Sequence, residues 1–163
     1  LKELFPIDGE VEDLIQRKRT LFNDAFDNKE DLYLIEGVEK LIQDLHRNGM
    51  LLILASSAAK VTIERVFKRF NLHQYFTHIV SGEDFPNSKP HPAIFEYAAS
   101  LSSAPKENCV VIEDSTNGIR AAKAAEIFCI GYNSENSKLQ DLSLADVVVE
   151  NLDDLSFDRI SKY

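Results

Sequence analysis

The stretch Met50-Leu51-Leu52-Ile53-Leu54-Ala55-Ser56-Ser57 decides the fold class of this 163-residue chain. It begins with an unbroken apolar run that has the length of a strand and is too short for a helix. Continuous rather than alternating apolar residues indicate a strand that is covered on both faces, as in a parallel sheet. The stretch therefore predicts a sheet with helices packed against both of its sides.

Outward from this stretch, helical and strand patterns alternate along the chain. Apolar residues at three- and four-residue steps predict helices, and short apolar runs between them predict further strands. The expected helices cover residues 11–26, 37–48, 60–70, 92–101 and 117–125, and the expected further strands cover 78–81, 109–112, 127–131 and 146–149. This order predicts an α/β fold with a doubly wound, parallel, Rossmann-like sheet over residues 32–163, preceded by a helical segment over residues 1–31.

The composition narrows the function classes. Lys and Arg number 18 against 27 Asp and Glu, a formal net charge of −9 with no basic stripe, which argues against nucleic acid as a partner. No run approaches the ~20 apolar residues that a membrane helix needs. The two cysteines, Cys109 and Cys129, lie in apolar runs without metal-type spacing, and we expect a reducing, cytoplasmic compartment.

Polar residues follow three of the predicted elements where ligands gather in open α/β sheets. Ser56 and Ser57 leave a buried strand and offer hydroxyls for an anion, although serine is also a favoured helix cap. Glu113 and Asp114 end another strand, and adjacent carboxylates suit a Mg²⁺ ion, although capping by Asp114 or Ser115 is an alternative.

A single lysine stands in the proline-flanked segment Ser88-Lys89-Pro90-His91-Pro92. Two prolines limit how far the backbone of the loop can wander. A positioned ammonium is useful beside a phosphate or between carboxylates, although an exposed loop is the simpler interpretation of the segment alone.

Together, in this order, the three motifs resemble the haloacid dehalogenase-like superfamily and its β-phosphoglucomutase-like group. The matching stretches are Ile53–Ser57, Ser88–Phe95 and Val111–Ala122, and the resemblance runs from about Leu32 to Val149. It implies that residues 1–31 are the remainder of a small helical cap. It also implies a Mg²⁺-dependent phosphatase or phosphomutase that acts on a small phosphorylated metabolite such as a sugar phosphate.

The resemblance assigns roles by position. Ser56, helped by the backbone around Ser57, would hold the transferring phosphoryl group, and Lys89 would offset the negative charge that builds there. Asp114 would ligate Mg²⁺ directly, with Glu113 as a further ligand or as its support. Arg17, Lys18 and Arg19 fall where related caps place basic residues that contact substrate, but a solvated helix face explains them equally well.

The chain departs from the family at one defining feature, the Asp-x-Asp pair that ends the first strand and supplies the nucleophile. No such pair occurs here, so we expect the chain alone to be inactive and its central first strand to be absent. The strands at 51–55 and 109–112 should then pair directly, or a copy of the chain should fill the slot by self-association.

Alternatives remain at this stage. The four residues Ser56, Lys89, Glu113 and Asp114 are common to phosphatases and mutases, so they do not separate the two. A non-catalytic module that binds phosphorylated ligands or a partner chain is a rival from another class, and a receiver-like signalling domain is a weaker one. Glu126 stands where relatives have Gly after a helix, and we expect a left-handed backbone there.

Overall fold

The computed structural model describes residues 11–135 and 139–163, and the chain divides into two compact units, 1–34 and 35–163. In the first unit, helix α1 (Val11–Asn28) contains the expected apolar repeat. Residues 1–10 of the expected cap segment lie outside the described residues. No helix in the described ranges combines the length and the apolar composition that crossing a membrane requires.

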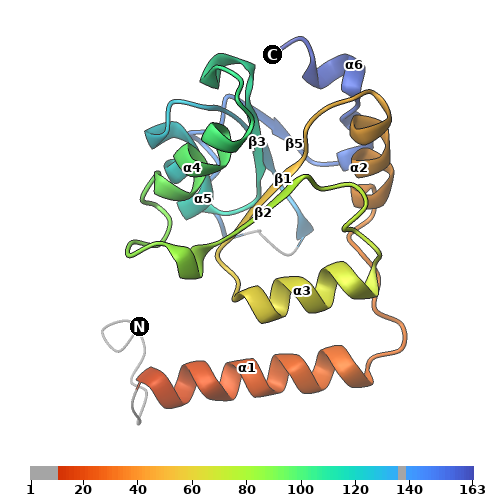
Figure 1. The fold of residues 1–163 in the computed structure, drawn as a ribbon, viewed down its shortest axis with the longest axis vertical. Coiled ribbons are helices and arrows are strands. Elements are labelled where there is room, and N and C mark those ends of the chain that lie inside the picture. The colour runs from red at the N-terminus through yellow and green to blue at the C-terminus, as the bar shows by residue number, and fades with distance from the viewer. Residues whose placement is uncertain (1–10, 136–138) are drawn as a thin grey trace. The chain divides into compact units, whose positions relative to one another are not determined.

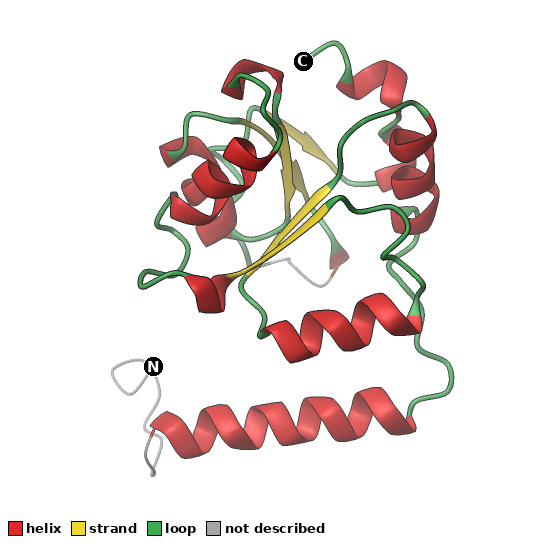
Figure 2. Ribbon diagram, in the orientation of Figure 1, coloured by secondary structure: helices red, strands yellow, loops and turns green. Residues whose placement is uncertain are grey.

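The second unit alternates strands and helices, as the sequence predicts (Figures 1 and 2). Its strands are β1 (Ile53–Ser56), β2 (His78–Ser81), β3 (Val110–Glu113), β4 (Phe128–Tyr132) and β5 (Val147–Val149). Its α-helices are α2 (Val38–Arg47), α3 (Lys60–Arg69), α4 (Ala93–Leu101), α5 (Thr116–Ala124) and α6 (Phe157–Ile160). Short 3₁₀ turns lie at η1 (Gly82–Asp84), η2 (Lys106–Asn108) and η4 (Leu152–Asp154). The predicted α/β class is confirmed.

All strand pairs in the described residues are parallel, but they form two sheets rather than one. Strand β1 pairs with β2, with Ile53 opposite His78, and the second sheet has the order β3-β4-β5. Strands β1 and β3 do not pair with each other, so the prediction of direct pairing is wrong. The reason lies in the backbone: each strand satisfies one edge with its other neighbour, and the two remaining edges stay separate.

Apolar side chains form two cores, one on each face of the β3-β4-β5 sheet. Alternation along β4 sends Cys129 into one core and Ile130 into the other. The Cys129 core contains residues of α4 and α5, and the Ile130 core contains residues of α2 and α6; these helices flank the sheet in Figure 2. Burial on both faces explains why the strands read as continuous apolar runs.

Helix α5 ends as the sequence predicts, with a residue in the left-handed conformation. Glu126 has φ 61°, and the Ile127 N–H donates to Ala122 O at 3.1 Å across the helix end. This bond from beyond the left-handed residue back to the last turn is the usual C-terminal closure, in which Gly normally takes the left-handed position. The prediction for Glu126 is confirmed.

Candidate phosphate and metal site

Lys89 joins the carboxyl ends of the two sheets. Its Nζ donates to Ala55 O in β1 at 3.2 Å and to Glu113 Oε1 in β3 at 3.3 Å. The Leu52 carbonyl accepts from Thr77 N just before β1 and β2, and successive residues of a strand face opposite edges. Ala55 O therefore faces away from β2, and the ammonium lies on the unpaired edge of β1. The peptide bond between Lys89 and Pro90 is cis.

Glu113 is held from three sides. Besides Lys89, the Ser115 hydroxyl donates to Glu113 Oε1 at 2.8 Å, and the side chains of Lys89 and Glu113 are only 10% and 14% exposed. A Cβ added at Gly118 would lie 1.6 Å from that same Oε1 atom, so the carboxylate rests directly on the glycine. The ring of Phe95 lies 4.5 Å from the Lys89 Nζ and covers the pair. A charged pair in this setting is weakly screened by solvent.

Asp114 follows β3 and is exposed, with no hydrogen bond or ion pair to any residue that the structure describes. Ser115 is the cap of α5, since its Oγ accepts from Gly118 N at 3.0 Å. The capping alternative therefore holds for Ser115 and not for Asp114. A carboxylate without a protein partner at a strand end is suited to a hard divalent cation.

The donor set fits Mg²⁺ only in part. Within residues 11–135 and 139–163, no three His, Cys, Asp or Glu side chains are arranged to hold a metal ion. Mg²⁺ usually binds proteins through one or two carboxylates and completes its shell with water and substrate phosphate. Asp114 can supply one such carboxylate, and Glu113, with Oε1 engaged by Lys89 and Ser115, is better placed as its support.

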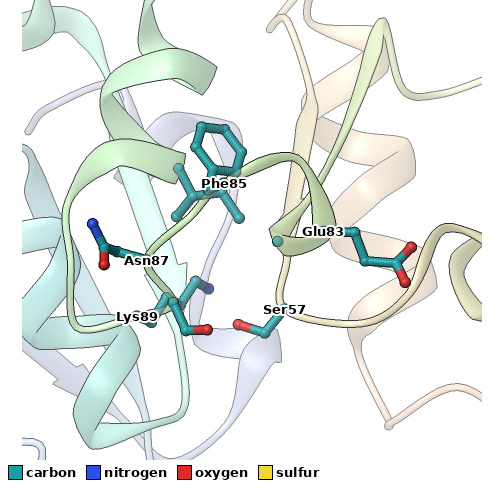
Figure 3. A pocket seen from close by; sticks show the side chains of 8 residues that line it. Ser57, Glu83, Phe85, Asn87 and Lys89 are labelled. Atoms are coloured by element: carbon teal, nitrogen blue, oxygen red, sulfur yellow. The ribbon is translucent and has the colours of Figure 1, made fainter.

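The loop after β1 does not cap the following helix with serine. The Ser56 hydroxyl accepts from Ala58 N at 3.1 Å, and α3 begins after Ala59, which has no capping side chain. The capping alternative is therefore wrong for both Ser56 and Ser57. Ser57 is exposed, and its hydroxyl points into a pocket beside Lys89 (Figure 3).

Two residues that the sequence analysis missed hold this loop. Ser81, 1% exposed at the end of β2, donates from its Oγ to Ala58 O at 2.8 Å. Glu83 in η1 accepts from Lys60 N, the first N–H of α3, at 2.8 Å. The signal for Ser81 was a polar residue at the end of an apolar strand. Nothing local marks Glu83, because its partner is 23 residues away.

The pocket has a volume of about 200 Å³. Ser57 and Glu83 lie on one side of it and Asn87 and Lys89 on the other, as Figure 3 shows. Gly82, Phe85, Ser88 and Ile94 complete its lining. Ser56, Glu113 and Asp114 do not line it, so Lys89 is the residue that connects the pocket to the two carboxylates.

The basic residues of α1 belong to the other unit. Arg17 and Lys18 are exposed on α1, and the side chain of Arg19 lies outside the described residues. Their contact with substrate stays a prediction.

Cys129 lies close enough to the site for the site's charges to affect it, but it is not a nucleophile. Burial, together with the negative charges of Glu113 and Asp146, raises the pKa of the Cys129 thiol to about 12. The thiolate is the reactive form of cysteine, so this thiol is unreactive at neutral pH.

Comparison with known proteins agrees with the three motifs. The chain is 32% identical over 124 residues to hexitol phosphatase B of Escherichia coli, an alignment that covers 76% of this chain and 56% of the relative. A crystal structure of CbbY from Rhodobacter sphaeroides in complex with phosphate superposes with a TM-score of 0.83 and 25% identity, covering 98% of this chain and 72% of that one. A β-phosphoglucomutase structure from Clostridium difficile gives 0.76 and 27%, covering 90% and 63%.

The chain spans about a third to three fifths of the length of the curated relatives that it matches. The model of the haloacid dehalogenase-like hydrolase family matches residues 1–132, which include all three motifs. This match decides against the receiver-like alternative. The chain belongs to the haloacid dehalogenase-like hydrolase family, in its β-phosphoglucomutase-like group.

Proposed function

We propose that the protein containing this chain is a Mg²⁺-dependent phosphatase or phosphomutase of the cytoplasm that acts on a small phosphorylated metabolite, most naturally a sugar phosphate. The observation that carries the proposal is the position of the Lys89 ammonium, between the end of β1 and Glu113 at the end of β3. A cation held at that point can neutralise a phosphoryl group that arrives at the strand ends.

The residues divide the work as follows. Ser56 and Ser57, with the backbone N–H groups of their loop, would bind the phosphoryl oxygens. Lys89 would stabilise the charge that develops on those oxygens during transfer, and its bond to Glu113 keeps the ammonium from swinging into solvent. Ser115 and Gly118 position Glu113 and so act on the phosphate through Lys89.

Asp114, supported by Glu113, would hold a Mg²⁺ ion together with phosphate oxygens and water. A bound Mg²⁺ would supply positive charge against the phosphoryl oxygens. Asp114 is exposed, and no described residue competes for its carboxylate, which supports this role.

Transfer through an aspartyl-phosphate needs an attacking carboxylate beside Lys89, and we place it outside these 163 residues. The Asp pairs within the chain are unsuited to attack. Asp24 and Asp27 lie in α1, and Asp153 and Asp154 lie in η4 after β5. We therefore expect the 163-residue chain to bind phosphate and to turn over no sugar phosphate.

Binding of inorganic phosphate to the purified chain, measured by titration calorimetry with and without Mg²⁺, tests the site. We expect Lys89→Met to weaken phosphate binding about tenfold or more, since hydrogen bonds to charged groups contribute about 1.5–3 kcal/mol. Lys68→Met, at the far end of α3, is the matched control and should leave binding unchanged. Asp114→Asn should remove the dependence on Mg²⁺.

Two results would contradict the proposal. Equal phosphate affinity in the wild-type chain and the Lys89→Met variant would remove the role of Lys89. Metal-dependent turnover of a sugar phosphate by the 163-residue chain would show that the attacking group lies within it. A chain that binds phosphate, joined to a full-length protein without turnover, would instead support the non-catalytic binding module.

A further inference from the structure

The first turn of helix α3 lies next to the phosphate-binding serines and is already neutralised by the protein. The first N–H groups of a helix and its dipole attract anions, so this helix end would be a natural place for a second anionic group of a substrate. Ala59, at the cap position, offers no side-chain acceptor. Instead, Glu83 Oε2 accepts from Lys60 N at 2.8 Å.

The adjacent residue neutralises the cation of the same turn. The Asp84 carboxylate forms a salt bridge with the ammonium of Lys60, the first residue of α3. Glu83 and Asp84 are consecutive in η1, so one short turn places two negative charges at the start of one helix. The turn is anchored to the loop from below, because the buried Ser81 hydroxyl bonds both Ala58 O and Glu83 N, at 2.8 and 3.2 Å.

This turn is also part of the pocket wall. Glu83 lines the pocket with Ser57 and Lys89, and its carboxylate points away from the pocket toward the start of α3 (Figure 3). The pocket-facing groups on the other walls are neutral, namely the Asn87 amide, the Ser88 hydroxyl and the apolar side chains of Phe85 and Ile94. Among the residues that line it, Lys89 is the one cation, and it is already paired with Glu113.

We infer that Glu83 and Asp84 are specificity-determining residues that restrict the site to phosphate esters whose remaining part is uncharged, such as polyol and sugar monophosphates. A bisphosphate or a phosphorylated carboxylic acid would bring its second negative charge near two fixed carboxylates, with no unpaired cation of the core unit to receive it. Neutral hydroxyl groups of a polyol would instead find the amide and hydroxyls of the pocket. This inference rests on the proposed function, because it assumes that Ser56, Ser57 and Lys89 bind a phosphoryl group.

The test compares ligands that share one phosphate and differ in the charge of the rest. Titration calorimetry on the purified chain would measure Kd for sorbitol 6-phosphate, phosphoglycolate and glucose 1,6-bisphosphate, with inorganic phosphate as the reference. The variants are Glu83→Gln and Asp84→Asn, singly and together. Both replacements keep an oxygen that can accept a hydrogen bond from Lys60, so the turn should stay in place, which thermal unfolding checks.

We expect the wild-type chain to bind sorbitol 6-phosphate about tenfold more tightly than either ligand with an anionic remainder. The double variant should reduce this ratio about three- to tenfold by strengthening the two anionic ligands, as expected for charges several ångströms apart. The change should shrink between 10 mM and 0.5 M salt. Glu107→Gln in η2, near the opposite end of β3, removes an exposed carboxylate without this effect and is the control.

The outcomes separate the two proposals. If inorganic phosphate fails to bind, the phosphate site itself is wrong and the specificity inference falls with it. If phosphate and sorbitol 6-phosphate bind but the anionic ligands bind as tightly in the wild-type chain, or if the ratio is the same in the double variant, the role of Glu83 and Asp84 is overturned while the phosphate site stands.

Discussion

The Nζ atom of Lys89 lies 3.3 Å from Glu113 Oε1, and together the two side chains connect two sheets that share no strand pairing. Lys89 comes from the loop after β2, and Glu113 ends β3. The pair therefore acts on the structure as well as on the phosphate. This double role makes the pair accessible to stability measurements that need no substrate.

Removing Lys89 alone should destabilise the unit more than removing both charges. Lys89→Met leaves the mostly buried Glu113 carboxylate with only the Ser115 hydroxyl among the donors described above, which should cost about 1–3 kcal/mol of unfolding free energy. Lys89→Met combined with Glu113→Gln should recover most of this loss. Urea unfolding of the two single variants and the double variant gives the coupling energy, and additive losses would show that the contact contributes no stability.

Gly118→Ala should disturb the site although alanine favours helices. The added Cβ would lie 1.6 Å from Glu113 Oε1, so the carboxylate must move and its contact with Lys89 must change. Helix propensity alone would stabilise α5 by about 1 kcal/mol. We expect weaker phosphate binding and no net gain in stability. Asn117→Ala, the exposed neighbour in α5, is the control, and identical behaviour of the two variants would contradict the packing of Glu113 on Gly118.

Glu126→Gly should stabilise the protein by about 1 kcal/mol. Glu126 has φ 61°, a conformation that costs a residue with a Cβ roughly this much and costs glycine little. Thermal unfolding should show a raised Tm for Glu126→Gly and an unchanged Tm for Glu126→Ala, which keeps the Cβ. A similar rise for alanine would mean that the glutamate side chain, and not its backbone, is unfavourable.

Asp146 should make stability depend on pH in the acidic range. Burial by itself would raise the pKa of Asp146, but hydrogen bonds from Lys123 and from Cys129 N, with the charge of Lys123, outweigh it and hold that pKa below its usual value. A lowered folded pKa stabilises the protein above the unfolded value of about 4 and loses that effect as the pH falls.

The measurement for Asp146 is unfolding free energy against pH. Asp146→Asn should cost about 1 kcal/mol at pH 7, since solvent partly screens the pair, and the difference from the wild-type chain should vanish toward pH 3. Asp31→Asn, an exposed aspartate of the other unit, should show no such dependence. A difference that persists at pH 3 would assign the effect to packing rather than to charge.

Most of the secondary structure could be predicted from the sequence, because its signals are local. Apolar periodicity marked the helices and strands to within a few residues, and the position of Glu126 after a helix marked its left-handed backbone. The strand-end motifs identified Lys89, Glu113 and Asp114 because polar residues after buried strands are conspicuous within a few positions of the chain.

The sequence by itself determined which side chains stand at the strand ends and that the strands are buried on both faces. Only the tertiary structure decided that β1 and β3 stay unpaired, that Lys89 bonds Ala55 O as well as Glu113, and that Glu83 rather than a serine caps α3. Periodicity and capping are properties of consecutive residues. The partners of Lys89 and Glu83 lie 34, 24 and 23 positions away, and such contacts exist only once the chain has folded.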